Sequence, residues 1–353
     1  MKDKYVGLDV HQSSTMAAVH DEKGKAVMES IVKTEAEAIR DFLKGLSGTI
    51  HVTFEEGTQA GWLYEIVKPL VAETVVCNPR ANKLLAVGNK GDRVDAHKLA
   101  ELLRGGQLKS VYHGGSSSRQ LKELVHNYDS LVSDTTRVMN RIKAIYRGRA
   151  IRCAGRDVYY TRHRDEWLEK LTEAGVRRRA EFLYQELDML RRLRREAKQA
   201  MLRESRRHPA DPTLKQIPVL GPIRIAEILA KVVSPHRFRT KRQFWAYCGF
   251  AVVTRSSADY EFVEGRAQKR QRAPMTRGLN PNFNRRLKYV FKSAAVDGMR
   301  QEPFQSYYLR RVAMGMRPEM ARLTLARKIA ALTLTLWKKG EGFDELKVSE
   351  PVA

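Results

Sequence analysis

A long heptad pattern limits the folds open to this chain more than any other feature of its sequence. Mostly apolar side chains recur at alternating spacings of three and four residues, at Leu121, Leu124, Tyr128, Leu131, Thr135, Val138, Ile142 and Ile145. This period places them along one side of a helix whose outside is polar. A second pattern contains Leu183, Leu187, Leu190, Ala197 and Met201, with Arg194 interrupting it. Two such helices form either an antiparallel hairpin or the seam of a dimer, and both interpretations stay open.

The residues before this pattern alternate between short strand-like and helical stretches. Strands are expected at residues 5–10, 15–20, 26–32, 50–54 and 74–77, and helices at 36–46, 62–70 and 92–104. Three successive strands followed by alternating helices and strands predict an α/β fold with a mixed sheet. Folds of this class build their sites where strands end at a carboxyl edge.

Turn-forming residues divide the chain into four predicted parts. Gly114, Gly115 and the serines after them form the clearest linker, and the pattern changes again after Pro209 and Pro212. We expect an α/β domain over residues 1–112, a helical coiled-coil region over 113–208 and an α-rich domain over 209–345. Residues 346–353 are expected to be a tail, in a stretch that is acidic and loose from Glu341 onward.

The charge of the chain is strongly asymmetric. It has 65 Lys and Arg against 40 Asp and Glu, a formal net charge of +25. Residues 1–103 hold 13 Lys and Arg against 15 Asp and Glu, so the positive excess lies entirely in residues 104–353. Such self-repulsion favours a polyanionic partner, and nucleic acid is the leading candidate. A basic binding protein without catalytic activity fits the charge alone equally well.

Several classes of protein are disfavoured. No stretch approaches the ~18 to 20 apolar residues that a membrane-spanning helix needs. The three cysteines, Cys77, Cys153 and Cys248, are scattered without a CxxC pair, which argues against a disulfide framework or a zinc site. The N-terminus is charged and then strand-like, unlike a signal peptide. The expected location is the cytoplasm.

Four carboxylates stand where a metal site would be built. Asp9 ends the first predicted strand, Glu55 ends the fourth, and Asp92 and Asp95 lie three residues apart on one face of a helix start. Oxygen ligands from separate elements select Mg²⁺ or Mn²⁺ over zinc. Two such ions, about 3.5–4 Å apart, can activate a nucleophile and stabilise the leaving oxygen at a phosphodiester. Each residue alone is common as a turn or helix-capping residue, so the interpretation depends on the set.

An actin-like ATPase is an alternative, because its first strand and phosphate loop have a similar apolar–Gly–apolar–Asp order. The phosphate loops of that fold continue with glycines and hydroxyls, whereas Asp9 is followed here by Val10, His11 and Gln12.

The N-terminal part resembles the RuvC-like (RNase H-like) DEDD domain of a family of bacterial insertion-sequence transposases, described as bridge-RNA-guided recombinases. The matching segments are Gly7-Leu8-Asp9-Val10-His11, Glu55-Glu56-Gly57-Thr58, Asn78-Pro79 and Asp92-x-x-Asp95-Ala96-x-x-Leu99-Ala100. Glu55, which directly ends the apolar strand, takes the family position in preference to Glu56.

The C-terminal half resembles the second domain of the same family. Ile217–Pro222 followed by Ala226 is similar to its helix-hairpin-helix turn, and Phe244–Phe250 is similar to one of its helices. Thr254-Arg255-Ser256-Ser257 follows where the family carries its catalytic serine, and counting from Gly249 favours Ser257 over Ser256. The resemblance continues through Arg266–Arg270, Arg277–Asn280 and the segment with Arg285, Arg286 and Leu287.

The resemblance implies a composite site in which the metal domain of one subunit meets the serine of another. Asp9, Glu55, Asp92 and Asp95 would be the metal ligands and Ser257 the nucleophile, with Mg²⁺ as cofactor and Mn²⁺ able to substitute. The partners would be double-stranded DNA, a structured noncoding guide RNA and other copies of the chain in a dimer or tetramer, on the bacterial nucleoid. The residues expected to bind nucleic acid are Arg255, Arg266, Lys269, Arg270, Arg277, Arg285 and Arg286.

Two other functions remain open from the sequence. One is a metal-only nuclease such as a junction resolvase, which does not need the serine segment. The other is a binding protein with a decayed metal site, against which the presence of all four carboxylates counts.

Overall fold

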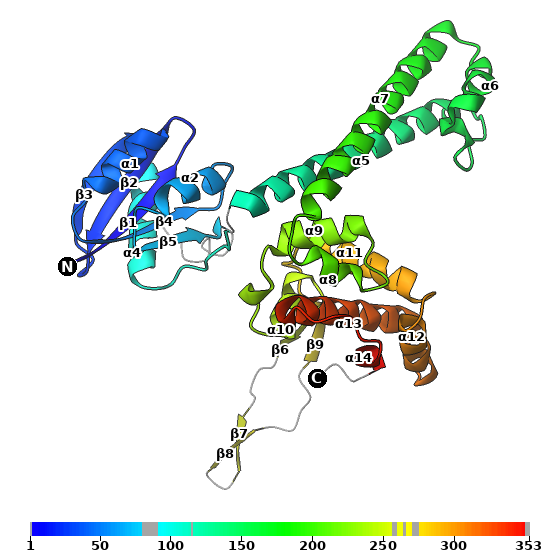
Figure 1. Ribbon diagram of the computed structural model, residues 1–353. Coiled ribbons are helices and arrows are strands. Elements are labelled where there is room, and N and C mark those ends of the chain that lie inside the picture. The colour runs from blue at the N-terminus through cyan, green and yellow to red at the C-terminus, as the bar shows by residue number, and fades with distance from the viewer. Residues whose placement is uncertain are drawn as a thin grey trace. The chain divides into compact units, whose positions relative to one another are not determined.

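The computed structural model describes residues 2–79, 91–113, 116–255, 260–263, 266–269 and 275–349. The chain forms two compact units, Met1–His113 and Gly114–Ala353 (Figure 1). In the described ranges, no helix is long and apolar enough to cross a membrane. The three cysteines, Cys77, Cys153 and Cys248, are buried and free.

The first unit is built on a five-stranded mixed sheet with the strand order β3-β2-β1-β4-β5. β1 pairs antiparallel with β2, which pairs antiparallel with β3; β1 also pairs in parallel with β4, and β4 with β5. The strand bounds are β1 Asp3–Val10, β2 Ser14–Asp21, β3 Ala26–Lys33, β4 Thr49–Glu55 and β5 Glu73–Cys77. The predicted mixed α/β sheet is therefore confirmed, in an arrangement consistent with an RNase H-like fold.

Helices cover both faces of this sheet. α1 (Ala36–Lys44) and α2 (Ala60–Val67) bury apolar side chains against the face that presents Val6 and Leu8 of β1. α4 (Asp92–Arg104) packs on the other face, because alternate residues of a strand point to opposite sides. α2 begins and ends earlier than predicted. Lys68 still has helical backbone dihedrals, and the helix ends there because Pro69 has no backbone N–H to continue the hydrogen bonds.

The two heptad patterns form an antiparallel hairpin within one chain. α5 (Ser116–Arg147) packs along α7 (Ala174–Ser205), as Figure 1 shows. Near the tip, the buried Tyr146 of α5 bonds to the buried Tyr184 of α7, with their hydroxyl oxygens 3.0 Å apart. At the other end, residues from the start of α5 share an apolar cluster with Met201 near the end of α7. The intramolecular hairpin is thus the arrangement that the chain adopts.

Short helices close the tip of the hairpin. The segment between α5 and α7 contains η1 (Asp157–Tyr159), η2 (Thr161–His163) and α6 (Arg164–Glu169). Trp167 of α6 lies edge-on to Tyr146, with ring centroids 5.1 Å apart. These elements give the tip its own apolar core.

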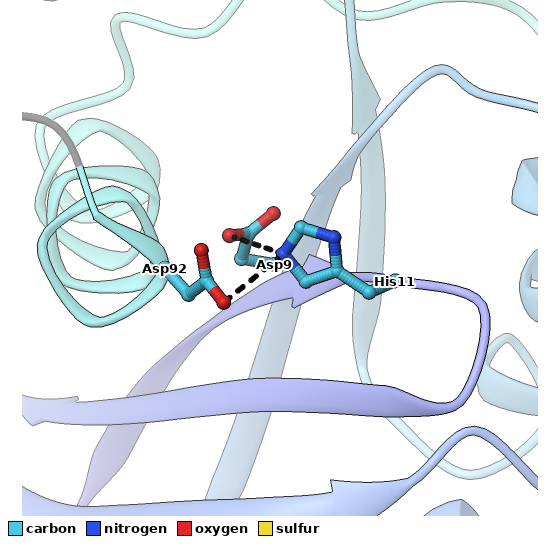
Figure 2. A group of neighbouring side chains, drawn as sticks. All are labelled: Asp9, His11 and Asp92. Atoms are coloured by element: carbon cyan, nitrogen blue, oxygen red, sulfur yellow. Dashed lines mark ion pairs between the residues drawn. The ribbon is translucent and has the colours of Figure 1, made fainter.

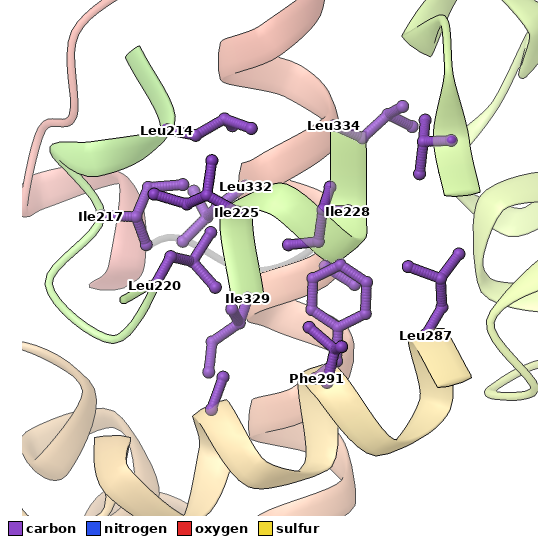
Figure 3. Close-up of a cluster of buried hydrophobic side chains, with 14 of the residues drawn as sticks. Leu214, Ile217, Leu220, Ile225, Ile228, Leu287, Phe291, Ile329, Leu332 and Leu334 are labelled. Carbon is purple, nitrogen blue, oxygen red and sulfur yellow. The ribbon is translucent and has the colours of Figure 1, made fainter. Parts of the chain in front are cut away.

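The rest of the second unit is mainly a helical bundle around α13 (Pro318–Lys339). Buried residues lie on all sides of α13, as expected for a helix at the centre of a core. Figure 3 shows its side chains packed against those of α9 and α11. The helix ends at Gly340, whose φ of +65° is the left-handed conformation that favours glycine. The other bounds are α8 Asp211–Lys215, α9 Pro222–Val232, η3 Pro235–Arg237, α10 Lys241–Tyr247, α11 Arg285–Gly298, α12 Phe304–Ala313 and α14 Leu346–Ser349.

Two features of this unit differ from the sequence-based expectation. Four short strands form two antiparallel pairs, β6 (Val252–Arg255) with β9 (Met275–Leu279) and β7 (Tyr260–Val263) with β8 (Arg266–Lys269). Strands this short and this charged carry little of the alternation that identifies a strand in sequence. The expected loose tail is partly packed, because Val348 of α14 is fully buried in the apolar core. The helix-hairpin-helix at Ile217–Pro222 stays a prediction; the segment joins α8 to α9.

Candidate active site

A row of small residues lets α4 lie directly against the sheet. Gly7 of β1 pairs with Ala18 of β2 and with Thr53 of β4, so the three occupy one line across the sheet. A Cβ atom built on Gly7 would lie 2.1 Å from the carbonyl oxygen of Ala96 in α4. Only glycine fits this contact, which sets the position of the helix start that carries Asp92 and Asp95.

Three side chains from separate elements converge beside this contact (Figure 2). Asp9 lies near the end of β1, His11 follows that strand, and Asp92 is the first residue of α4. The Nε2 atom of His11 lies 3.3 Å from an oxygen of Asp9 and 3.3 Å from an oxygen of Asp92. One ligand atom of each residue lies within 4.8 Å of the others, a spacing that could hold a metal ion.

The electrostatics of Asp9 reflect a crowded acidic site. Burial raises the pKa of the Asp9 carboxyl, His11 lowers it, and the charges of Asp92 and Asp95 raise it further. Asp95 therefore lies within electrostatic reach of Asp9, although it is not among the three converging residues. Negative charges that raise the pKa of Asp9 favour a neighbouring cation, because the cation offsets their repulsion.

Glu55 lies on the strand next to Asp9. Leu8 pairs with Phe54, so Asp9 and Glu55 are the next residues on two neighbouring parallel strands. Glu55 and His11 both line a cavity of about 530 Å³. The adjacent Glu56 instead contacts His113, with Oε2 and Nε2 2.6 Å apart. This difference favours Glu55 over Glu56 as the carboxylate directed to the site.

His11 is not among the predicted site residues, although it ends the segment Gly7–His11 that carries part of the family resemblance. The available signal was the Asp-x-His spacing at the end of a strand, where the backbone N–H of His11 donates to Ser14 and turns the chain toward β2. Its imidazole could add a nitrogen ligand to an otherwise carboxylate set, which would widen the choice of metal toward Mn²⁺ and other transition ions.

Two family models match the chain, one over each half. A transposase model of the DEDD domain of IS110 elements matches residues 6–148, which include Asp9, Glu55, Asp92 and Asp95. A model described as transposase of the IS116/IS110/IS902 family matches residues 211–309. The chain belongs to the IS110/IS116/IS902 transposase family. It is therefore a DNA-processing enzyme, and the resemblance noted from its sequence is confirmed at this level. A comparison with curated proteins gives no match.

A second layer of polar contacts holds α4 of this transposase on the sheet. Glu29 of β3 accepts hydrogen bonds from Arg93 and contacts His97 at 2.8 Å, and both partners lower its pKa. Nδ1 of His97 lies 2.8 Å from Nε2 of His20, whose pKa is lowered chiefly by burial. Glu29, Arg93, His11 and Asp92 border one further cavity of about 440 Å³. These contacts tie α4 to β2 and β3 beside the metal-ligand candidates.

The candidate serine of the transposase and several of its basic candidates lie wholly or partly outside the described residues. Ser256, Ser257 and Arg270 lie outside the described residues. Arg255, Lys269 and Arg277 have described backbones in β6, β8 and β9, but their side chains lie outside the description. Arg266 at the start of β8 is exposed, as is Arg285 at the start of α11.

Arg286 occupies a different environment from the other basic candidates. Its guanidinium lies 2.7 Å from a carboxylate oxygen of Asp129 and also bonds to Glu227, whose side chain is 3% exposed. The charge of Arg286 is therefore neutralised within the transposase, between α5, α9 and α11. This arrangement favours a structural role for Arg286 over phosphate contact.

Proposed function

We propose that this transposase cuts and rejoins DNA at a composite site, with divalent metal held by carboxylates of the first unit and Ser257 as nucleophile. The observation that carries the proposal is the convergence of Asp9 and Asp92, which are far apart in the sequence of the first unit. The contact of α4 with Gly7 brings their carboxylates close enough to His11 for all three side chains to bind one metal ion. A strand end and a helix start supply carboxylates to one point, which is the arrangement that a hard divalent cation requires.

The donor set fits Mg²⁺, with Mn²⁺ able to substitute. Asp9 and Asp92 would bind directly, Glu55 and Asp95 would complete the set, and His11 would bind or orient a ligand. A cation there would polarise the scissile phosphate and stabilise charge on the leaving oxygen. The raised pKa of Asp9 supports this assignment, since a group of carboxylates without a cation is electrostatically unfavourable.

Ser257 would store the energy of the phosphodiester during strand exchange. Its hydroxyl oxygen would form a bond to phosphorus while the bond from phosphorus to the leaving strand's oxygen breaks, and the hydroxyl proton would end on that oxygen. The reverse reaction with a different strand then rejoins DNA without an external energy source. The serine interpretation rests on the family resemblance of Thr254-Arg255-Ser256-Ser257, and Ser256 is the alternative.

The basic part of the chain would bind DNA and a structured guide RNA, with other copies of the chain completing the composite site. The positive excess in residues 104–353 supports a polyanionic partner. Arg255, Arg266, Lys269, Arg270, Arg277 and Arg285 are the proposed phosphate contacts. Base pairing by the RNA would then supply most of the sequence specificity.

A metal-only nuclease is the second candidate, because the Asp9, His11 and Asp92 cluster lies wholly within the first unit and needs no serine. The two are separated by incubating the protein with Mg²⁺, the RNA co-transcribed with its element and DNA carrying the element ends. A denaturing gel then detects a covalent protein–DNA adduct. We expect the adduct in the parent and in Asp41→Asn, an exposed control on α1, and its loss in Ser257→Ala and Asp9→Asn.

Other outcomes of this experiment are equally informative. Loss of the adduct in Ser256→Ala but not in Ser257→Ala would move the nucleophile by one residue. Nicked DNA without adduct, unchanged by either serine substitution but lost in Asp9→Asn, would establish the metal-only nuclease instead.

A further inference from the structure

A cavity in the second unit has the chemistry of an anion site but belongs to none of the residues assigned above. Its volume is about 620 Å³, and it lies among α10, the start of β6, α12 and α13. Arg242, Arg311 and Arg327 line it, together with Trp245, Thr254 and Tyr307. A volume in the range of about 300–1,000 Å³ is typical of small-ligand sites.

The three arginines of this cavity have no acidic partner among the described residues. Among the residues that the structure describes, the cavity lining contains no Asp or Glu, and none of the three arginines forms an ion pair with a carboxylate. Arg327 is half-buried, and its Nε–H donates to the carbonyl oxygen of Phe250 at 2.9 Å. Burial alone lowers the pKa of Arg327. A partly desolvated cation without a counter-charge is unfavourable, so the cavity favours an anionic occupant.

The remaining lining provides one unsatisfied polar group and a flat apolar surface. Tyr307 is 3% exposed, and its buried hydroxyl has no hydrogen-bond partner in the described structure. The guanidinium of Arg311 lies over the Tyr307 ring, 5.2 Å from its centroid. Trp245 is fixed by a hydrogen bond from its Nε1–H to the carbonyl oxygen of Arg327 at 3.0 Å. A fixed aromatic ring beside arginines is the combination that binds unstacked bases and their phosphates.

We infer that this cavity, which we call the arginine pocket, binds one nucleotide of an unpaired nucleic-acid strand, with the phosphate held by Arg242, Arg311 and Arg327 and the base against Trp245. A paired base stays stacked inside its duplex, so a concave pocket lined by an aromatic ring selects an unpaired strand. Thr254 of the pocket precedes Ser257 by three residues in sequence, which connects the pocket to the segment proposed for strand cleavage. The inference rests on the proposed function in that a strand must pass this segment, but it does not require Ser257 to be the nucleophile.

Arg310 and Arg311 provide a matched pair for the test. They are neighbours on α12 and carry the same charge, but only Arg311 lines the arginine pocket. We would measure the binding of a fluorescently labelled six-nucleotide oligothymidylate to the full chain by anisotropy, over a series of salt concentrations. Oligouridylate of equal length and a labelled DNA duplex are the comparison probes, and no metal is added, so that cleavage plays no part.

We expect Arg311→Gln to weaken binding of at least one single-stranded probe about tenfold, and Arg310→Gln to change it less than twofold. Loss of one phosphate contact should also reduce the salt dependence of log K by about 0.7 for a single strand. A preference for the DNA or the RNA probe identifies which strand the pocket serves. Equal effects of the two substitutions on the single-stranded probes, or an effect of Arg311→Gln confined to the duplex, would overturn the inference.

The binding measurement and the adduct assay fail independently. If the parent forms the adduct but Arg311→Gln binds the oligonucleotides as the parent does, the proposed function stands and the nucleotide-binding role of the arginine pocket is rejected. If Arg311→Gln weakens oligonucleotide binding but the parent forms no adduct, the nucleotide-binding role of the pocket stands and the serine chemistry is rejected.

Discussion

Gly7 and Ala96 are in contact through their backbones, and this contact positions the carboxylates of the candidate metal site. A Cβ atom on Gly7 would lie 2.1 Å from the carbonyl oxygen of Ala96 and 2.6 Å from the amide nitrogen of Ala100. Both distances are far shorter than a carbon atom tolerates. The first strand and α4 can therefore approach closely only while residue 7 has no side chain, and Asp92 reaches Asp9 as a result.

Gly7→Ala should displace α4 and weaken the first unit. Overpacking a tight contact costs about 1–3 kcal/mol, and the backbone clash here places the effect at or above the upper end. Hydrogen exchange of peptides from β1 and α4 should be faster than in the parent. The affinity for Mg²⁺ should fall as well, because Asp92 moves away from Asp9. Gly45→Ala is the matched control, because a Cβ there meets its nearest neighbour at 3.4 Å, an ordinary contact. Equal protection of β1 in Gly7→Ala and the parent would contradict the prediction.

Divalent metal should stabilise the first unit through Asp9. A ligand that binds only the folded state raises its stability by about 2.7 kcal/mol at a hundred times its dissociation constant. We expect Mg²⁺ and Mn²⁺ to raise the unfolding temperature of the parent and of Asp41→Asn, but not that of Asp9→Asn or Asp92→Asn. Because the pKa of Asp9 is raised, protons should compete with the metal at a higher pH than for an ordinary aspartate. A metal-induced shift that survives in Asp9→Asn would rule out this site.

The hydroxyl groups of Tyr146 and Tyr184, at the tip of the hairpin, should be strongly coupled in their effect on the free energy of unfolding. Tyr146→Phe or Tyr184→Phe leaves one buried hydroxyl without its partner, which costs about 1–3 kcal/mol. The double substitution removes both polar groups and should be less destabilising than the sum of the two single ones. Urea unfolding of the four proteins, followed by circular dichroism, measures the coupling. Strict additivity would mean that the two hydroxyls do not depend on one another.

Glu227 should make the stability of the second unit depend on pH. Burial is the largest cause of its raised pKa, which Arg286 opposes and Asp129 reinforces. An acid whose folded-state pKa is raised contributes stability that is present below its ordinary pKa and lost as the pH rises through the raised value. Glu227→Gln should therefore gain stability relative to the parent as the pH rises, by about 1.4 kcal/mol if the folded and unfolded pKa values of Glu227 differ by about one.

The control for Glu227 is Glu123→Gln, an exposed position on α5. Its difference from the parent should stay constant over the same pH range in urea unfolding. A parallel pH dependence in both variants would assign the effect to net charge, which is high throughout this chain.

Local patterns in the sequence determined the secondary structure of the first unit and the two long helices of the second, but not the four short strands β6 to β9. Alternation and helical periodicity identified the five strands of the mixed sheet and the two long helices, because these signals depend on neighbours a few residues apart. Strand ends and a helix start likewise identified Asp9, Glu55 and Asp92 as candidates. The resemblance of both halves to the transposase family was carried by short segments of the same kind.

The tertiary structure decided what depends on residues far apart in sequence. It paired the two heptad patterns with each other, placed His11 between Asp9 and Asp92, and enclosed Arg286 between two carboxylates. It also packed Val348 into the core and gathered three arginines around one cavity. The sequence alone does not distinguish a basic side chain that faces DNA from one that is paired with a carboxylate inside the protein. Only the packing of distant elements sets its neighbours and therefore the electrostatic environment in which it acts.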